Sequence, residues 1–215
     1  MKLFGRKQEP FQRVEGEPSS ATWKAAADAF PQTGQWPLLL VGDRLDLGRV
    51  EPVQDFDVRE RLEGWWVENQ SEDEELAEML GPFPGVAEPG LTRDEGAVDV
   101  VLSQLDNVTG LVLVAVERPA DVLAAIGWTG AINSQTAAEL TPFLRSWEER
   151  FDTLPVAVGY DTLQLVARRL PSAADAEKIT AELYLFNNDL VDLDDNCIAE
   201  LAPSLMQPHW QFWWD

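Results

Sequence analysis

The stretch LVLVAV at residues 111–116 is the longest apolar run in the chain. A short run this rich in branched aliphatic residues is typical of a buried strand at the centre of a sheet. Pro119 then stands where the first residue of a helix is expected, and Gly127 ends that short helix. A longer helix is expected from Ser134, with an apolar stripe formed by Ala137, Leu140, Leu144, Trp147 and Phe151.

The rest of the second half continues this alternation of strands and helices. Two short apolar stretches, 154–158 and 163–166, predict strands that flank a tight turn. A helix is expected after Pro171, with a buried face formed by Ala176, Ile179, Leu183 and Phe186. Another helix is expected at about residues 195–205, and residues 209–215 alternate like a final strand. The predicted fold is α/β or α+β, with a mixed central sheet flanked by helices on both faces.

The first half is predicted to be mainly helical. Residues 19–30 have apolar positions at helical spacing, a second helical pattern begins at Asp55, and residues 73–80 continue it as a very acidic helix. Residues 36–41 are apolar and end at a glycine, which is typical of a buried strand.

Composition divides the chain into four parts. Residues 1–18 are predicted to be a flexible basic tail, and residues 19–80 the N-terminal helical part. Glycine and proline occupy seven of the sixteen positions from 81 to 96, a density that excludes regular structure and predicts a linker or long loop. Residues 97–215 are the predicted α/β domain.

The net charge excludes several classes of partner. The chain has 38 Asp and Glu against 16 Lys and Arg, so its formal net charge is -22 at pH 7. A field of this sign repels nucleic acids and anionic membranes, and we expect neither as a partner. It would attract a basic protein, although an acidic surface also serves solubility alone. No apolar run is long enough to cross a membrane or to serve as a signal peptide, which favours a cytoplasmic protein.

Several strings in the second half resemble a known family. They are Arg118-Pro119, Gly127-Trp128, Gly130-Ala131 with Asn133, Ser146-Trp147-Glu148, Arg150-Phe151 and the terminal Phe212-Trp213-Trp214-Asp215. In this order they resemble the bacterial domain-of-unknown-function family 4253 over about residues 110–215. The chain departs from the family pattern at Glu182-Leu183, where Glu-His is usual, and at residues 187–189, where a segment with Cys is usual. The resemblance implies a fold unit and no established activity.

Glu182 is one of five candidate carboxylates in the second half. It lies at the border of the apolar face of its helix, so it needs a partner, and Arg145 and Arg150 of the neighbouring helix are the candidates. We interpret such a pair as a structural tie between helices, whereas in a cleft the carboxylate could act as a general acid or base or as a metal ligand. The full candidate polar cluster consists of Asn133, Glu148, Arg150, Asp161, Glu182, Asp189 and Asp215.

Two further motifs are candidates for binding sites. The turn with Gly127, Gly130 and Ser134 leads into a helix N-terminus that could bind an anion, although tight-turn glycines explain this turn equally well. Residues 192–203 follow an EF-hand loop in part, but Cys197 stands where glycine is required and Pro203 where a bidentate glutamate is required. We therefore expect no metal site, and the sequence shows no cofactor motif.

The terminal aromatic residues are predicted to belong to the core. In a strand, Trp210, Phe212 and Trp214 share one face, while Gln211, Trp213 and Asp215 share the other. Because Asp215 carries two carboxylates, we expect Arg145 or Arg150 to lie near it.

Two functional hypotheses follow. Cys197 and His209 are the only residues of their types, and the chain shows no catalytic set that includes them. This favours a non-enzymatic protein-binding module, of which an immunity-type inhibitor of a basic toxin is one form. The alternative is a hydrolase-like enzyme of unknown substrate that uses carboxylates of the second half.

Overall fold

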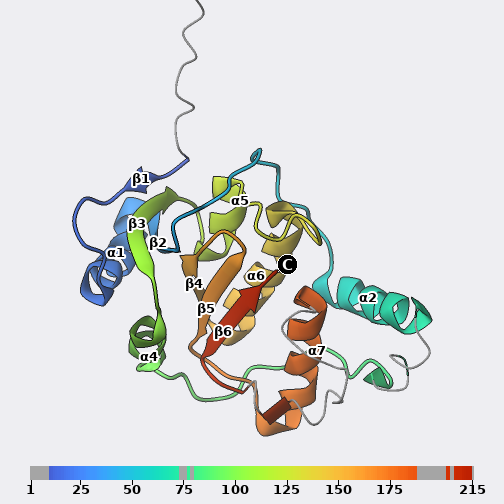
Figure 1. Cartoon of the computed structure of the whole chain (residues 1–215). Coiled ribbons are helices and arrows are strands. Elements are labelled where there is room, and N and C mark those ends of the chain that lie inside the picture. Colours follow the sequence, from blue (N-terminus) through green and yellow to red (C-terminus); the bar gives the residue numbers. More distant parts are fainter. Residues whose placement is uncertain (1–9, 73–76, 78–79, 188–201, 204–205, 215) are drawn as a thin grey trace, which may run out of the picture.

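Six strands form one mixed sheet at the centre of the molecule (Figure 1). Their spatial order is β1-β3-β2-β4-β5-β6, and the strands are β1 (Gln12–Arg13), β2 (Gln35–Val41), β3 (Val108–Ala115), β4 (Thr153–Val158), β5 (Thr162–Ala167) and β6 (His209–Trp213). The pair β2–β4 is parallel, and all other neighbouring strands are antiparallel. The computed structural model describes residues 10–72, 77, 80–187, 202–203 and 206–214. It confirms the predicted mixed sheet, in an α+β fold.

The apolar runs of the sequence are the buried strands. Residues 111–115 of the apolar stretch lie in β3, which begins three residues earlier, at Val108, and ends at Ala115. All six residues of β4 are buried, and so are five of the six in β5. These strands have apolar side chains on both faces because helices cover both faces of the sheet.

One face of the sheet is covered by α6 (Ala137–Phe151) and α7 (Ala176–Phe186). Trp147 of α6 packs against Phe186 of α7 and stacks on Phe212 of β6, with ring centroids 4.7 and 5.9 Å away. Trp210, Phe212 and Trp214 are at most 3% exposed, whereas Trp213 is 47% exposed. The alternation predicted for the last strand is therefore confirmed, and its inner face belongs to the core.

The opposite face is covered by α1 (Ser20–Thr33) and α4 (Ala97–Gln104). Trp23 of α1 lies edge-on to Trp36 of β2, and its indole N–H donates to the carbonyl of Pro37. Gln104 of α4 contacts His209, which alternates with the inward-facing Trp210 along β6.

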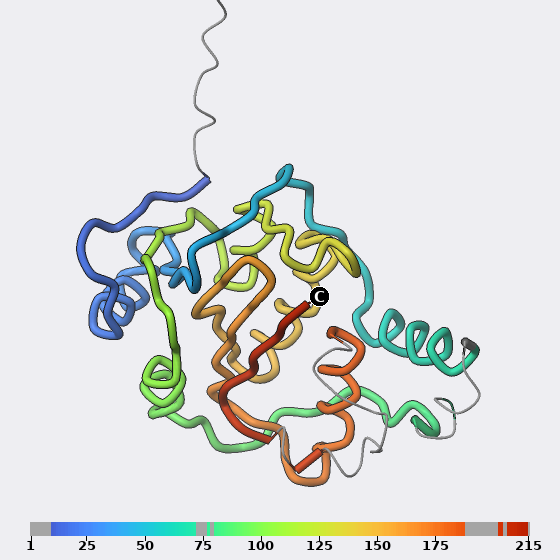
Figure 2. Tube along the Cα trace, viewed as in Figure 1, coloured from blue at the N-terminus to red at the C-terminus, as the bar shows by residue number. Residues whose placement is uncertain are grey.

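The mainly helical character predicted for the first half is only loosely supported. This half contributes α1 and α2 (Val58–Glu72), together with the predicted strand at residues 36–41, which is β2 and lies between β3 and β4 of the second half. Figure 2 shows the chain running from β2 past the connection between α5 (Val122–Ile126) and α6 before it reaches α2. The 3-10 turns η1 (Pro119–Asp121) and η2 (Ala173–Asp175) precede α5 and α7.

One local prediction differs from the structure. The longer helix of the second half begins at Ala137, because Thr136 rather than Ser134 is its N-cap. Thr136 and Glu139 form a reciprocal capping box, and the backbone hydrogen bond from Thr136 is the main reason that the pKa of Glu139 is lowered. The glycine- and proline-rich residues 81–96 contain no helix or strand, yet Ala87 in their middle is fully buried.

Some predictions concern residues that the structure does not describe. These are the helix at 195–205 in large part, the loop with Cys197, most of the acidic helix at 73–80, residues 1–9 of the basic tail, and the side chains of Asp189 and Asp215. Within the described residues, no helix combines the length and the hydropathy needed to cross a lipid bilayer.

Candidate functional site

Glu182 lies at the centre of a buried hydrogen-bond network between α6 and α7. Its side chain is 0% exposed, and its two oxygens accept four hydrogen bonds. Arg150 donates two of them, from Nη1 to Oε1 at 2.9 Å and from Nη2 to Oε2 at 2.6 Å. Trp147 Nε1 donates to Oε2 at 2.8 Å, and the backbone N–H of Ala87 donates to Oε1 at 2.7 Å. The carboxylate therefore has a charge partner and no exposed oxygen.

The network also fixes Arg150. Its Nη1 donates a second bond to the carbonyl of Ala87 at 2.7 Å, and its Nε donates to Ser146 Oγ at 3.2 Å. Helix α6, helix α7 and the loop around Ala87 are thus joined through one guanidinium. Of the two partners that the sequence proposed for Glu182, the structure selects Arg150, since Arg145 pairs with Asp121 instead. The bidentate geometry is that of a strong charge-assisted pair.

A second ion-pair network lies beside the first. Glu148 accepts from Arg118 Nε at 2.6 Å and from the backbone N–H of Ala120 at 3.1 Å, so both of its oxygens are occupied. Arg118 also donates to Glu149 at 3.0 Å. Burial alone would lower the pKa of Arg118, but the hydrogen bonds to Glu148 and Glu149 outweigh it and the pKa is raised. The hydrogen bond to Asp121 likewise raises the pKa of Arg145.

The three arginines of these networks line one surface pocket, which we call the Arg150 pocket. It has a volume of about 560 Å³, and Arg118, Arg145 and Arg150 form part of its wall. The segment at residues 54–59 and the loop with Glu88 close its other side. These three arginines are already paired with carboxylates, and Arg59 shares the pocket wall with Asp55 and Asp57, so the pocket has no surplus of positive charge with which to hold an anion.

The remaining members of the candidate polar cluster lie elsewhere. Asp161 is in the turn between β4 and β5, where its side chain accepts from the indole N–H of the exposed Trp213 at 3.1 Å. Asn133 is exposed in the connection between α5 and α6. The structure thus joins Arg150 to Glu182 and places Glu148 in the neighbouring network, whereas Asn133 and Asp161 lie in other segments and Asp189 and Asp215 lie outside the described residues.

Most N–H groups of the turn proposed as an anion site donate to carbonyl groups within the protein. Gly127 donates to Ala124, Trp128 to Leu123, Thr129 to Asp46, and Ser134 to Ala131. Its glycines serve chain geometry instead. Gly127 has a left-handed φ of 66°, and a Cβ on Gly130 would lie 2.1 Å from the indole of Trp128. This arrangement argues against a phosphate-type cradle and for a tightly packed turn.

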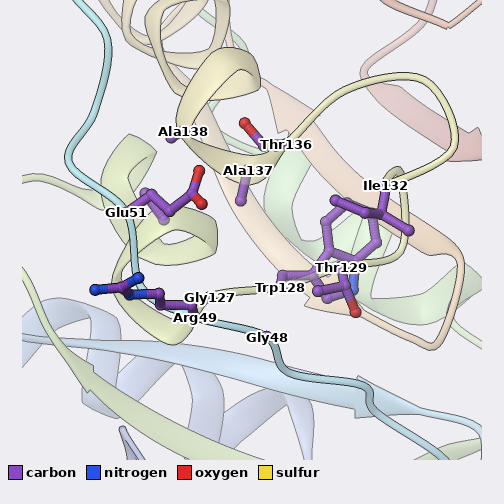
Figure 3. A pocket seen from close by; sticks show the side chains of 11 residues that line it. Gly48, Arg49, Glu51, Gly127, Trp128, Thr129, Ile132, Thr136, Ala137 and Ala138 are labelled. Atoms are coloured by element: carbon purple, nitrogen blue, oxygen red, sulfur yellow. The ribbon is translucent and has the colours of Figure 1, made fainter.

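This turn borders a smaller pocket, which we call the Trp128 pocket. Its volume is about 190 Å³, and its wall combines residues of the turn, the start of α6 and residues 48–51. Figure 3 shows Arg49 and Glu51 on one side and Trp128, Thr129 and Ile132 on the other, with residues 136–138 between them. The pocket therefore has a charged end and a largely apolar end.

His209, the only histidine of the chain, is hydrogen-bonded within the described residues. His209 lies between two amide side chains, with Nδ1 3.0 Å from Gln104 Oε1 and Nε2 2.9 Å from Gln164 Oε1. Burial lowers its pKa. The described residues contain no group of three or more His, Cys, Asp or Glu side chains able to hold a metal ion.

Sequence reasoning missed two groups at these sites. Ala87 carries no chemical signal in its side chain, because it contributes only its backbone N–H and carbonyl to the Arg150 network. Arg49 and Glu51 lie in an unpatterned stretch of the first half, more than seventy residues from the turn that they face. The pairing of Leu47 with Trp128 brings the two segments together, and nothing local in either segment encodes that pairing.

Comparison with known proteins supports the resemblance. Residues 110–215 match the family described as "Domain of unknown function (DUF4253)". No curated protein and no solved structure matches the chain. Within the matched segment, the strings around Arg118, Glu148 and Arg150 form the ion-pair networks, while those around Gly127 and Trp128 form the wall of the Trp128 pocket.

Proposed function

We propose that the chain is a non-enzymatic protein-binding module whose partner is a basic protein. The observation that carries the proposal is that many of the few basic side chains already form ion pairs with carboxylates of this chain. Among the described residues, eight do so: Lys24, Arg44, Arg93, Arg118, Arg145, Arg150, Arg168 and Lys178. Because the chain has 38 acidic residues and only 16 basic ones, many surface carboxylates have no basic side chain of the same chain to neutralise them.

A surface of this kind suits capture of a positively charged partner. Long-range attraction speeds encounter between proteins of opposite charge, and like charge suppresses wrong partners. An immunity-type inhibitor of a basic toxin is one such module, and it is the finer form of this proposal. Trp213, 47% exposed and held by Asp161, offers an aromatic contact of the kind enriched at the centre of protein interfaces.

The hydrolase alternative has less support from the site geometry. A general acid or base must reach the proton that it transfers. Glu182 has both oxygens occupied and is 0% exposed, and both oxygens of Glu148 are also occupied. These two carboxylates act as ties between helices in this arrangement. A screen of melting temperature against divalent metals and nucleotides tests the alternative, since a shift with one of them would favour an enzyme.

The binding proposal is tested with the immobilised full chain. A lysate of the source cells is passed over it at low and at high ionic strength, next to an unrelated protein of similar length and net charge. We expect a basic protein that the control does not retain, and the purified pair should associate at least about ten-fold more slowly at high salt. Retention of the same proteins by both columns, or of no basic protein, would refute the proposal.

A further inference from the structure

The Trp128 pocket offers opposite charges at one end. Arg49 and Glu51 both line it, and neither forms a hydrogen bond or ion pair with the rest of the described chain. This sets Arg49 apart from Arg118, Arg145 and Arg150, which already have carboxylate partners. A ligand with only one charge would leave one of these two side chains without a counter-charge.

The other end of the pocket is apolar. The indole N–H of Trp128 donates to the carbonyl of Gly159 at 2.8 Å, which leaves the hydrocarbon part of the ring for the pocket. Ile132 and Ala137 complete this end. The volume of about 190 Å³ exceeds the roughly 150 Å³ of an apolar cavity that accepts benzene, so a ring or a branched aliphatic group has room.

The charged segment is held firmly against the pocket. Gly48 N–H donates to the carbonyl of Gly127 at 2.7 Å, and Thr129 donates to the carbonyl of Asp46 from both its N–H and its hydroxyl. A Cβ on Gly127 would lie 3.2 Å from the backbone of Arg49, so the two segments are in close contact. The pocket is thus largely formed before any ligand arrives, as is usual for small-molecule sites.

We propose that the Trp128 pocket binds a free α-amino acid with an apolar side chain. The carboxylate of the ligand pairs with Arg49, its ammonium pairs with Glu51, and its side chain lies against Trp128 and Ile132. A zwitterion with an apolar side chain can pair with both Arg49 and Glu51 and place its apolar group at the apolar end of the pocket. This site is separate from the protein partner proposed above, and either proposal can fail without the other.

The test is a titration of the ¹⁵N-labelled full chain with leucine, followed by the amide shifts of Gly48, Thr129 and Ile132. Three analogues isolate the contacts: 4-methylpentanoate lacks the ammonium, 3-methylbutylamine lacks the carboxylate, and glycine lacks the side chain. We expect saturable shifts with leucine and at least about ten-fold weaker binding of each analogue.

Variants test the charged end. Arg49→Gln and Glu51→Gln should each weaken leucine binding at least about ten-fold. Arg59→Gln and Glu63→Gln remove the same charges from α2, away from this pocket, and should leave binding unchanged. All four positions are exposed, so the variants should fold. Absence of saturable shifts at tens of millimolar leucine, equal binding of the amine or the acid, or unaltered binding by both pocket variants would overturn the proposal.

Discussion

Replacing Arg150 by methionine should destabilise the protein strongly. Methionine keeps an unbranched apolar stem of similar length, so the change removes mainly the charge and its hydrogen bonds. The variant leaves Glu182 without a charge partner at a position that is 0% exposed. It also leaves the carbonyl of Ala87 without the guanidinium donor that it has at 2.7 Å.

The size of the effect follows from burial. Removing one partner of a buried ion pair costs about 3–5 kcal/mol, because an uncompensated charge stays in a low-dielectric interior. Domains are typically stable by only about 5–15 kcal/mol, so this loss is a large fraction of the total. For a chain of this length each kcal/mol corresponds to a shift of about 2–4 °C, which gives an expected fall in melting temperature of about 6–20 °C.

The assay is urea unfolding followed by near-UV circular dichroism, together with a thermal melt. Lys24→Met is the matched control, since it removes an exposed pair with Asp99 and should cost at most about 1 kcal/mol. The double variant Arg150→Met, Glu182→Leu should be less destabilised than the sum of its single changes, with a coupling of about 0.5–3 kcal/mol. If Arg150→Met stays within about 1 kcal/mol of the parent, the pair is not the tie between helices that we describe.

Three further changes test other parts of the fold. Gly130→Ala should cost about 1–3 kcal/mol in urea unfolding, because its Cβ would meet Trp128, whereas Gly64→Ala in α2 meets nothing within 4 Å and should not destabilise. Thr136→Ala should cost about 0.5–2 kcal/mol through loss of the capping box, and Ser134→Ala, which is not the cap, should leave the melting temperature unchanged. Burial lowers the pKa of His209, so the unfolded chain binds this proton more readily and stability should fall as pH drops through about 6.5. His209→Gln should remove that part of the pH dependence, and an identical slope in both proteins between about pH 5 and 8 would contradict it.

The strands and the main ion pair could be predicted from the sequence because their signals are local. Residues 36–41, 154–158 and 163–166 are apolar runs bounded by turn residues, and each lies in a strand of the sheet. Glu182 stands out because a carboxylate at the edge of an apolar stripe needs a partner, and the neighbouring helix has two arginines five residues apart. The spacing of apolar residues along the chain, and the need of a buried carboxylate for a partner, are sufficient for these inferences.

The strand order and the exact partners could not be predicted in this way. The insertion of β2 between β3 and β4 depends on pairings between residues far apart in the chain, such as Leu39 with Leu111 and with Ala157. Thr136 rather than Ser134 is the N-cap because the side chain of Glu139 reaches back to the backbone N–H of Thr136. Ser134 and Thr136 both carry a hydroxyl group, so the residue types alone do not show which of them is the cap. Backbone donors such as the N–H of Ala87 are the same in every residue but proline, so no sequence pattern identifies them.

The two pockets differ in how much of them lies within the family match. Arg118, Arg145 and Arg150 all lie within residues 110–215, and so do the carboxylates that they pair with. The Trp128 pocket is divided, because its apolar end lies within that segment and its charged end, Arg49 and Glu51, lies in the first half of the chain. A protein that shares only the matched segment would therefore retain the ion-pair ties of the fold and an apolar wall, but not the two charges that select a zwitterion. Ligand choice at this pocket is then a property of the first half of the chain, and a change confined to residues 48–51 should alter it while the sheet and the Arg150 network stay intact.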